Sequence, residues 1–303
     1  MQNQPRSTDP EWTIIKLLKW TTSYFESHDI DGSRIEAEIL LAHALQLQRI
    51  DLYLQYDRPL SSNELSRFKD LIKRRINREP VAYILGSKEF WSMDFMVTKD
   101  VLIPRPDTEF LVEAAINLLP KDSASNPMLT PKRILELGTG SGAVILALAS
   151  MRPCHLFFAS DRITAAVKLA KQNAKHHGFE SKVSFVCADW FGSFKDKMPL
   201  FDMIVSNPPY VPSRVIGKLQ PEIVRYEPIS AIDGSEDGLS CLRYIINNAH
   251  FYLQRKGHLL LEIGHDQRND VQNIVDQCSK YENVVYTKDY SGYDRVVQMR
   301  KKK

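Results

Sequence analysis

The spacing of apolar residues changes along the chain, and each change predicts a different kind of structure. From residue 9 to about residue 85, apolar residues recur with a period near 3.6, which predicts helices that pack as a small bundle. Asp9 is expected to cap the first of them. From Lys132 onward, short apolar runs alternate with helical patterns. This alternation predicts βαβ units, and therefore a parallel sheet covered by helices on both faces.

Two pairs of residues in the helical region have the spacing of a capping box. Ser33 with Glu36 and Ser61 with Glu64 each place a hydroxyl three residues before a carboxylate at the start of an apolar stripe. In the first of these helices, the stripe is expected to include Ile35. Both pairs are therefore predicted to mark helix starts.

A short β-prone stretch separates the two patterns. Apolar and aromatic residues around Phe90 and Phe95 flank a turn near Ser92 and Asp94, which predicts a β-hairpin at 86–105 that links two domains.

Beyond the hairpin the pattern becomes helical again. Pro106 ends the hairpin, and a helix is predicted from Asp107 or Thr108 through Leu119. Residues 120–131 are polar and Pro-rich, as in a loop.

The alternating region has five candidate strands in its interior and two near its end. The five are 133–137, 155–160, 183–187, 202–206 and 257–263. The last two, 283–290 and 294–300, are close enough to pair as a hairpin at the sheet edge. We therefore divide the chain into a helical N-terminal domain (1–85), a hairpin linker (86–105) and an α/β domain (106–303).

Composition excludes several classes of protein. With 43% apolar and 25% charged residues among 303, and a net charge of +3, the chain resembles an ordinary globular protein without a coat of positive charge for nucleic acid. Its four cysteines show no zinc-ligand spacing, so we expect reduced thiols and no metal. No apolar run is long enough for a membrane span, and the first residues lack a signal-peptide pattern. We expect a cytoplasmic protein that does not bind membranes.

A strand, a Gly-rich turn and a helix follow one another in RILELGTGSGAVILALA. The turn and the acid before it are candidate cofactor-binding residues: Glu136, Gly138, Thr139, Gly140, Ser141 and Gly142. Glycines let the backbone approach a ligand closely, and the helix that follows offers free N–H groups. The spacing is G-x-G-x-G and not the G-x-G-x-x-G of dinucleotide folds. An acid beside the turn suits an amine-bearing ligand better than a pyrophosphate.

Acidic residues also end the next two predicted strands. Asp161 ends the second, where ribose hydroxyls are usually held, and Asp189 with Trp190 ends the third. A ligand with an adenosine and an amino-acid end would match this set, which predicts S-adenosyl-L-methionine. Asp161 would bind its ribose, and Asp189 and Trp190 would flank its adenine.

The fourth predicted strand ends in Asn207, Pro208, Pro209 and Tyr210, our candidate substrate-binding residues. All of them except Pro209 are also our candidate catalytic residues. A planar amide or aryl amine is a poor nucleophile, so positioning is most of the task. The side-chain oxygen of Asn207 and the main-chain oxygen of Pro208 can each accept an N–H of such a group. Tyr210 can stack on it, and the prolines keep the backbone rigid. No charged general base is needed, because the N–H becomes acidic only as the methyl group arrives.

The segments ELGTGSG, ASD, ADW and SNPPY resemble class I S-adenosylmethionine-dependent methyltransferases of Rossmann-like fold that act on planar nitrogens. Two further segments, RRINREPVAYILGSKEFWSMDFMVTKDVLIPRPDTEFLVE and RYEPISAIDGSEDGL, are similar to the release factor glutamine methyltransferases (PrmC/HemK family). The resemblance implies a seven-stranded, mostly parallel sheet after a helical domain and a hairpin. It implies cofactor contacts at Gly138 to Gly142, Asp161, Trp190 and Asn207. It also implies methylation of N5 of the glutamine in the GGQ motif of class 1 peptide chain release factors, with S-adenosyl-L-homocysteine as product.

Other functions remain open from sequence alone. One alternative is an N6-adenine nucleic-acid methyltransferase, which uses the same four-residue device, although no base-reading domain is evident and no direct nucleic-acid substrate is expected. Another is the related ribosomal protein glutamine methyltransferase. A third is a protein that binds S-adenosylmethionine without chemistry, against which the intact Asn207 argues. Arg105 is expected to brace the hairpin or contact substrate, and Glu227 and Asp233 to line the substrate entrance or order their loop.

Overall fold

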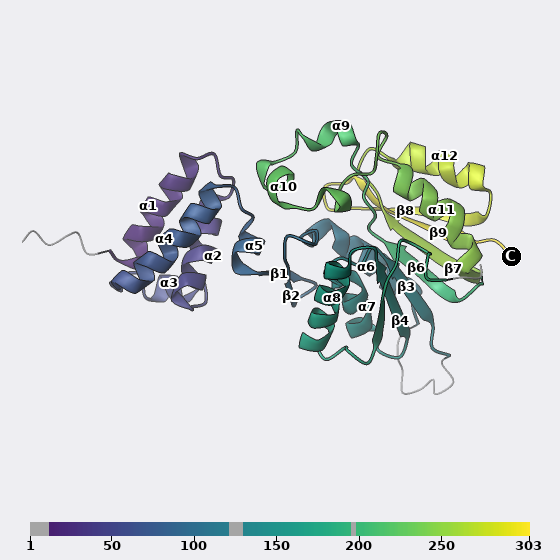
Figure 1. The fold of residues 1–303 in the computed structure, drawn as a ribbon, viewed down its shortest axis with the longest axis horizontal. Coiled ribbons are helices and arrows are strands. Elements are labelled where there is room, and N and C mark those ends of the chain that lie inside the picture. Colours follow the sequence, from purple (N-terminus) through teal and green to yellow (C-terminus); the bar gives the residue numbers. More distant parts are fainter. Residues whose placement is uncertain (1–11, 121–129, 195–197) are drawn as a thin grey trace, which may run out of the picture. The chain divides into compact units, whose positions relative to one another are not determined.

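A computed structural model describes residues 12–120, 130–194 and 198–303. The chain forms two compact units, Met1–Gly86 and Ser87–Lys303, and each is described below by itself (Figure 1). The predicted cap at Asp9 and most of the predicted loop at 120–131 lie outside the described residues.

The N-terminal unit consists of helices, as the 3.6-residue period predicts. They are α1 (Ile14–Glu26), α2 (Ser33–Leu45), α3 (Asp51–Leu54), α4 (Ser62–Ile76) and α5 (Val81–Leu85). Their apolar faces meet in a core that includes Leu18, Phe25, Leu41 and Phe68, each at most 1% exposed. Burial of these faces stabilises the helices, which are too short to be stable alone in water.

Only one of the two predicted capping boxes is present. Ser61 and Glu64 form it at the start of α4. At α2, the chain enters the helix through Gly32 at a φ of +66°, so that Ser33 is already helical and cannot cap. Glu36 instead pairs with Arg75 at 2.5 Å. The predicted capping box at Ser33 is therefore wrong, although the helix does begin at Ser33 as predicted.

The predicted inward stripe of α2 is also partly wrong. Ile35 is 54% exposed, and the helix buries Ala37, Leu40, Leu41 and Ala44. These residues belong to the core of the N-terminal unit. The buried face is thus rotated relative to the predicted one.

The hairpin, β1 (Ser87–Phe90) and β2 (Met93–Met96), belongs to the second unit. Its two-residue turn consists of Trp91 and Ser92, both at positive φ, which is the geometry that matches the twist of paired strands. Asp94, predicted in the turn, lies within β2. The hairpin is bound to α8 (Thr164–His176) through Asn173, which accepts from Met96 N at 2.8 Å and donates to Met96 O at 3.0 Å.

The second unit is built on a seven-stranded sheet. Its strands are β3 (Arg133–Leu137), β4 (Leu156–Asp161), β5 (Val183–Cys187), β6 (Phe201–Ser206), β7 (Leu253–Glu262), β8 (Tyr281–Lys288) and β9 (Asp294–Lys301). The order is β5-β4-β3-β6-β7-β9-β8, with parallel pairing from β5 to β7 and antiparallel pairing of β9 with both neighbours. The predicted α/β fold with a terminal hairpin at the sheet edge is confirmed.

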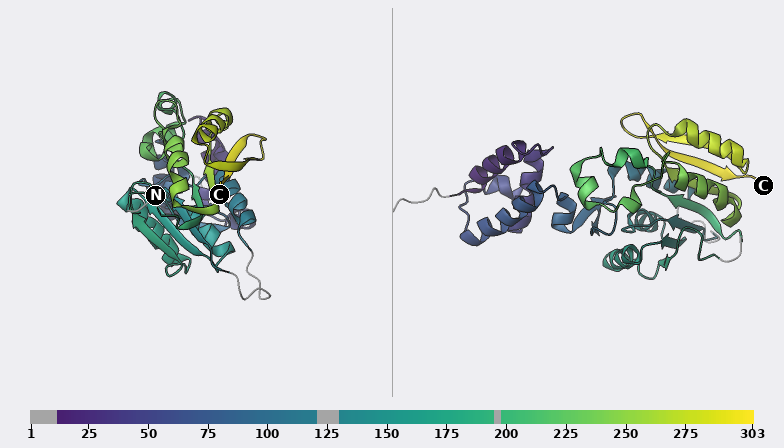
Figure 2. Two further views of the ribbon diagram at one scale, coloured as in Figure 1. Left: turned by 90° about the vertical axis from the view of Figure 1, so that its right-hand side faces the viewer. Right: turned by 45° about the horizontal axis from the view of Figure 1, so that its top comes forward.

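Helices cover both faces of this sheet. Besides α8, the helical elements are η1 (Pro106–Thr108), α6 (Glu109–Leu118), α7 (Ala143–Met151), α9 (Ser213–Ile216), α10 (Pro221–Tyr226), η2 (Ile229–Ala231), α11 (Ser240–Tyr252) and α12 (Arg268–Cys278). Residues of α6, α7 and α8 belong to one buried cluster, and residues of α11 and α12 to another on the opposite face (Figures 1 and 2). Among the described residues, no helix is long and apolar enough to cross a membrane.

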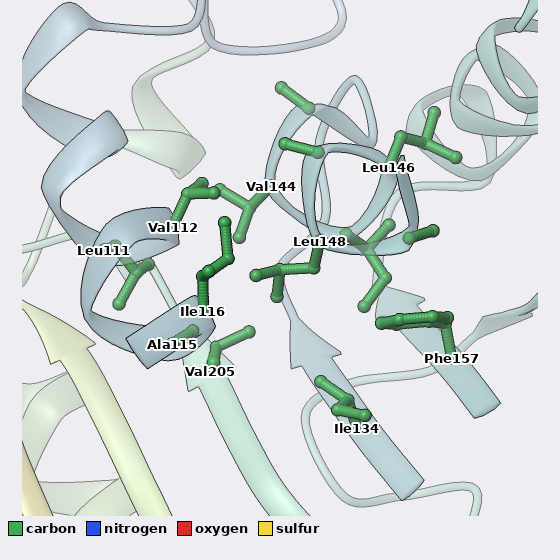
Figure 3. Packing of buried hydrophobic residues seen from close by; sticks show 14 of the residues in the cluster. Leu111, Val112, Ala115, Ile116, Ile134, Val144, Leu146, Leu148, Phe157 and Val205 are labelled. Carbon is green, nitrogen blue, oxygen red and sulfur yellow. The ribbon is translucent and has the colours of Figure 1, made fainter. Parts of the chain in front are cut away.

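Helix α7 is nearly all apolar because it lies between the sheet and other helices. Its residues 143–149 are all buried, and Leu148 packs near Ile116 of α6 and Ile134 of β3 (Figure 3). Val205 of β6 and Phe157 of β4 extend the same cluster. The Gly-rich turn that precedes α7 thus rests on a close-packed and rigid base.

Asn173→Ala is expected to destabilise the second unit by about 3 kcal/mol. The fully buried Asn173 makes three hydrogen bonds, two to the half-buried Met96 and one to the buried Ser141 O at 2.8 Å, and their loss leaves these backbone groups unpaired. Chemical denaturation measures the change. Asn247→Ala, which removes an exposed amide from α11, serves as the control. Equal stabilities of the two variants would contradict this role of Asn173.

Candidate active site

A cavity of about 510 Å³ lies in the second unit, at the carboxyl ends of β3, β4 and β6. It brings together most of the residues that the sequence singles out: Glu136, Gly138, Thr139, Gly140, Ser141, Asp161, Asp189, Trp190, Asn207 and Pro209. Gly142, Pro208 and Tyr210 do not line it. Open α/β sheets bind ligands at this edge, where the strand order reverses.

The three glycines of the turn have different surroundings, although all have positive φ. A Cβ at Gly138 or Gly140 would meet open space, so these backbones border the cavity without a side chain between them and a ligand. A Cβ at Gly142 would lie 3.2 Å from the Cβ of Ala170. Gly142 therefore allows α7 to begin close against α8.

Asp161 fixes the turn to the end of β4. Its Oδ2 accepts a hydrogen bond from Gly140 N at 2.9 Å, and its Oδ1 accepts one from Ile163 N at 2.9 Å. A carboxylate has about four acceptor positions, so both oxygens keep capacity for ligand hydroxyl groups. The carboxylate lines the cavity at the place where ribose hydroxyls are usually held.

Glu136 is a buried acid beside the cavity, with 3% of its surface exposed. Thr139 Oγ1 donates to its Oε2 at 2.5 Å. Burial raises the pKa of Glu136 to about 8, although the hydrogen bond from Thr139 favours the charged form. An ammonium group in the cavity would favour the carboxylate and lower this pKa.

The end of β5 supplies the wall of the cavity farthest from β6 in the sheet. Asp189 and Trp190 both line the cavity, and Trp190 has a φ of +46° in the turn after the strand. The ring of Trp190 lies 6.3 Å from that of Tyr244 on α11. An aromatic ring beside a carboxylate suits a flat heterocycle with exocyclic N–H donors.

The end of β6 is tied to the end of β3, which carries the Gly-rich turn. Ser206 Oγ donates to Leu137 O at 2.7 Å, and these two residues are also partners in the β3–β6 register. The next residue, Asn207, donates from Nδ2 to Thr108 Oγ1 at 3.0 Å. Its Oδ1 and the second proton of its Nδ2 are left for a ligand, and the side chain lines the cavity.

Two residues of the Asn-Pro-Pro-Tyr turn, Pro208 and Tyr210, do not line the cavity. Pro208 is buried, and Tyr210 donates from its hydroxyl to Glu262 Oε1 at 3.1 Å. Gln267 Nε2 donates to Tyr210 O at 2.9 Å. Burial raises the pKa of Tyr210, so it stays a neutral donor. Stacking of the Tyr210 ring on a substrate stays a prediction.

Three residues that the sequence analysis did not select support this turn. Thr108 contacts Asn207, Glu262 accepts from Tyr210, and Arg295 faces Glu262 and pairs with Asp107 at 3.1 Å. One signal was available in the sequence. Glu262 follows the apolar run of β7 just as Glu136 follows that of β3, so it is another acid at the same edge of the sheet.

Arg105 braces a neighbouring loop. Its Nη2 lies 2.5 Å from Oε1 of the buried Glu227, whose Oε2 accepts from Ile103 N at 3.2 Å. Asp233 accepts at Oδ1 from Ser213 Oγ and from a main-chain N–H, which orders its own loop. Arg105 and Asp233 also line the cavity, whereas Glu227 does not.

Comparison with known proteins gives matches along nearly the whole chain. The family profile for the PrmC N-terminal domain matches residues 16–86, and a methyltransferase domain profile matches residues 130–302. A release factor glutamine methyltransferase of Geobacter sulfurreducens is 39% identical over 94% of this chain and 96% of its own length. One of Coxiella burnetii is 40% identical over 88% and 92%. The solved structure of human methyltransferase 10 domain containing protein covers 80% of this chain and 99% of its own, with 18% identity and a TM-score of 0.52, which shows a shared fold.

The free energy of unfolding is expected to fall as pH rises from 5 to 8. Glu136 and Glu262 have pKa values of about 8 and 7 in the folded protein, above their ordinary value of 4.5, so the folded state binds more protons than the unfolded state in this range. In Glu136→Gln, the free energy of unfolding should fall by about 3 kcal/mol less over this pH range than in the wild type. Glu113→Gln, at an exposed position on α6, should show the same fall as the wild type. Denaturant titrations at several pH values measure the slope. A wild-type slope in Glu136→Gln would contradict the buried, protonated state.

Proposed function

The chain belongs to the release factor glutamine methyltransferase family, and from this premise we propose how its cavity carries out methyl transfer. The donor is S-adenosyl-L-methionine, the acceptor is N5 of the glutamine in the GGQ motif of a class 1 peptide chain release factor, and S-adenosyl-L-homocysteine is released. The observation that carries the proposal is the side-by-side placement of the Gly-rich turn and Asn207 at the ends of paired strands.

The residues that line the cavity fit S-adenosyl-L-methionine. Bare backbone at Gly138 and Gly140 permits close approach of its methionyl part, and Glu136 matches its ammonium group. Asp161 keeps acceptor positions for ribose hydroxyls, and Trp190 offers a ring for adenine. When bound, this molecule supplies an electrophilic methyl group. Thr139, Ser141 and Asp189 complete the predicted contacts, and Gly142 supports them by its packing.

Asn207 and Pro208 hold the substrate amide in this proposal. The Asn207 amide donates to Thr108, which leaves its Oδ1 free to accept one N–H of the glutamine. The main-chain oxygen of Pro208 accepts the other. These acceptors aim the nitrogen and stabilise the positive charge that builds on it, and one amide proton is lost as the C–N bond forms. Pro209 and Tyr210 keep the turn rigid, the latter through Glu262.

We propose that the N-terminal helical unit recognises the release factor and that the reaction takes place in the cytoplasm. Support comes from the family profile that matches residues 16–86 as a separate N-terminal domain. The competing acceptors are a ribosomal protein glutamine and the exocyclic amine of adenine in nucleic acid. The net charge of +3 gives no electrostatic reason to favour nucleic acid.

The acceptor can be tested directly. The purified chain, incubated with tritiated S-adenosyl-L-methionine, should label a class 1 release factor and should not label a variant whose GGQ motif is changed to GGA. Ribosomal proteins and duplex DNA serve as parallel acceptors. Label on either of these, with none on the release factor, would contradict the proposal and favour the corresponding alternative.

Asn207→Ala is expected to lower kcat at least 100-fold, because it removes one of two acceptors that position the nitrogen. Binding of S-adenosyl-L-homocysteine should change by less than about 5-fold, since most of its contacts lie on other residues. Calorimetric titration and the methyl-transfer assay measure the two effects. Asn247→Ala, at an exposed position, provides the matched surface control. Transfer at the wild-type rate in Asn207→Ala would refute the role given to this amide.

A further inference from the structure

Thr108 is placed where it can control the orientation of Asn207. It ends the short η1 turn, is 5% exposed and lines the cavity. Its Oγ1 accepts the hydrogen bond from Asn207 Nδ2 at 3.0 Å, although the two residues are 99 positions apart in the sequence. A carboxamide has two nearly isosteric ends, so the shape of the site alone does not determine which end faces a ligand.

We propose that Thr108 is a positioning residue for methyl transfer, which holds the Asn207 carboxamide with Oδ1 toward the substrate. The inference rests on the proposed function, because the substrate amide is what requires an acceptor at this point. If the amide were reversed, Nδ2 would face the N–H groups of the substrate, and two donors would oppose one another. The orientation of one side chain thus decides whether the site attracts or repels the acceptor nitrogen.

A hydroxyl can donate as well as accept, so Thr108 needs a group that fixes its own direction. Glu262 provides it. This carboxyl group is 1% exposed, and burial raises its pKa to about 7, whereas the nearby Thr108 hydroxyl favours its charged form. When Glu262 is ionised it can only accept, which favours a Thr108 hydroxyl that turns its proton toward Glu262 and its lone pair toward Asn207. Only Nδ2 can then bond to Thr108.

Glu262 is available for this role. Its Oε1 accepts from Tyr210, and its buried Oε2 has no hydrogen-bond partner within the described part of the chain. The charged groups that act on it are Arg295, which stabilises the carboxylate, and Asp107, which opposes it. A buried carboxylate oxygen without a partner is stabilised when a nearby hydroxyl group donates a hydrogen bond to it. With Glu262 ionised, the order of donors and acceptors therefore runs from Glu262 to Thr108 and then to Asn207.

The backbone around Thr108 is held from both sides. Thr108 N donates to Arg105 O at 3.0 Å, and Arg105 is itself paired with the buried Glu227. On the other side, Asp107 pairs with Arg295, which also bonds to Asp289 at 2.9 Å. The hydroxyl is thus presented from a fixed position, as accurate placement of Asn207 requires.

The test compares Thr108→Val, which keeps the shape of the side chain but lacks the hydroxyl, with Thr108→Ser, which keeps the hydroxyl. Thr108→Val should lower kcat for release factor methylation about 30- to 300-fold, and Thr108→Ser less than about 3-fold. The Kd of S-adenosyl-L-homocysteine should change by less than about 3-fold in both variants. A structural role would instead lower stability and affinity together, so denaturation midpoints are measured as well.

A double-mutant cycle shows whether Thr108 acts through Asn207. Adding Thr108→Val to Asn207→Ala should lower kcat by less than about 2-fold further, because the amide that Thr108 orients is already absent. Fully multiplicative losses would overturn the proposal. So would a Thr108→Val enzyme within about 3-fold of wild type.

A second readout needs no substrate and separates this inference from the proposed function. In the wild-type protein, the side-chain NH₂ signals of Asn207 in nitrogen-15 NMR spectra should show one slowly exchanging proton, and Thr108→Val should abolish its protection. If this holds but the release factor is not methylated, the proposed substrate is wrong while the positioning role stands. Unchanged Asn207 signals in Thr108→Val would overturn the positioning role itself.

Discussion

The parallel pairing of β3 and β6 is the constraint on which the site depends. Their register places Leu137 opposite Ser206, and a side-chain hydrogen bond joins these residues. The Gly-rich turn and Asn207 each begin at the end of these strands, so the pairing brings them together although about 70 residues separate them. The same alignment continues to β7, where Leu261 lies opposite Ser206, so that Glu262 follows at the same level.

Two buried acidic side chains support the two turns that this alignment brings together. Glu136 stands behind the Gly-rich turn, and Glu262 stands behind the Asn-Pro-Pro-Tyr turn. Burial raises the pKa of both, which shows that each carboxylate is held in an environment that disfavours its charge. Such groups lower stability unless they are paired. We infer that Glu136 is retained because it attracts the ammonium group of the methyl donor. Glu262 is retained because it helps to orient Thr108 and, through it, Asn207.

Sequence alone predicts the parts of the fold that depend on local patterns. The strands 133–137 and 183–187 match the structure at both ends, because apolar runs bounded by polar residues determine them. Strand β7 begins at Leu253 and not at 257, since it follows α11 without a loop that a pattern could mark. The capping pair at Ser33 fails because Gly32 moves the helix start by one residue. Candidate residues of the cavity could be selected because each follows a strand. Thr108 could not be selected, since its contact with Asn207 is made only by the tertiary fold.

The central claim is that a glutamine amide is held between Asn207 and Pro208 in front of the cavity. A crystal structure of this chain with S-adenosyl-L-homocysteine and a class 1 release factor tests it most directly. The account predicts that the glutamine side-chain nitrogen of GGQ lies within hydrogen-bond distance of Asn207 Oδ1 and Pro208 O, with the sulfur of the nucleoside on its other side. A GGQ motif bound elsewhere, or an Asn207 amide that turns its nitrogen toward the substrate, would contradict the account.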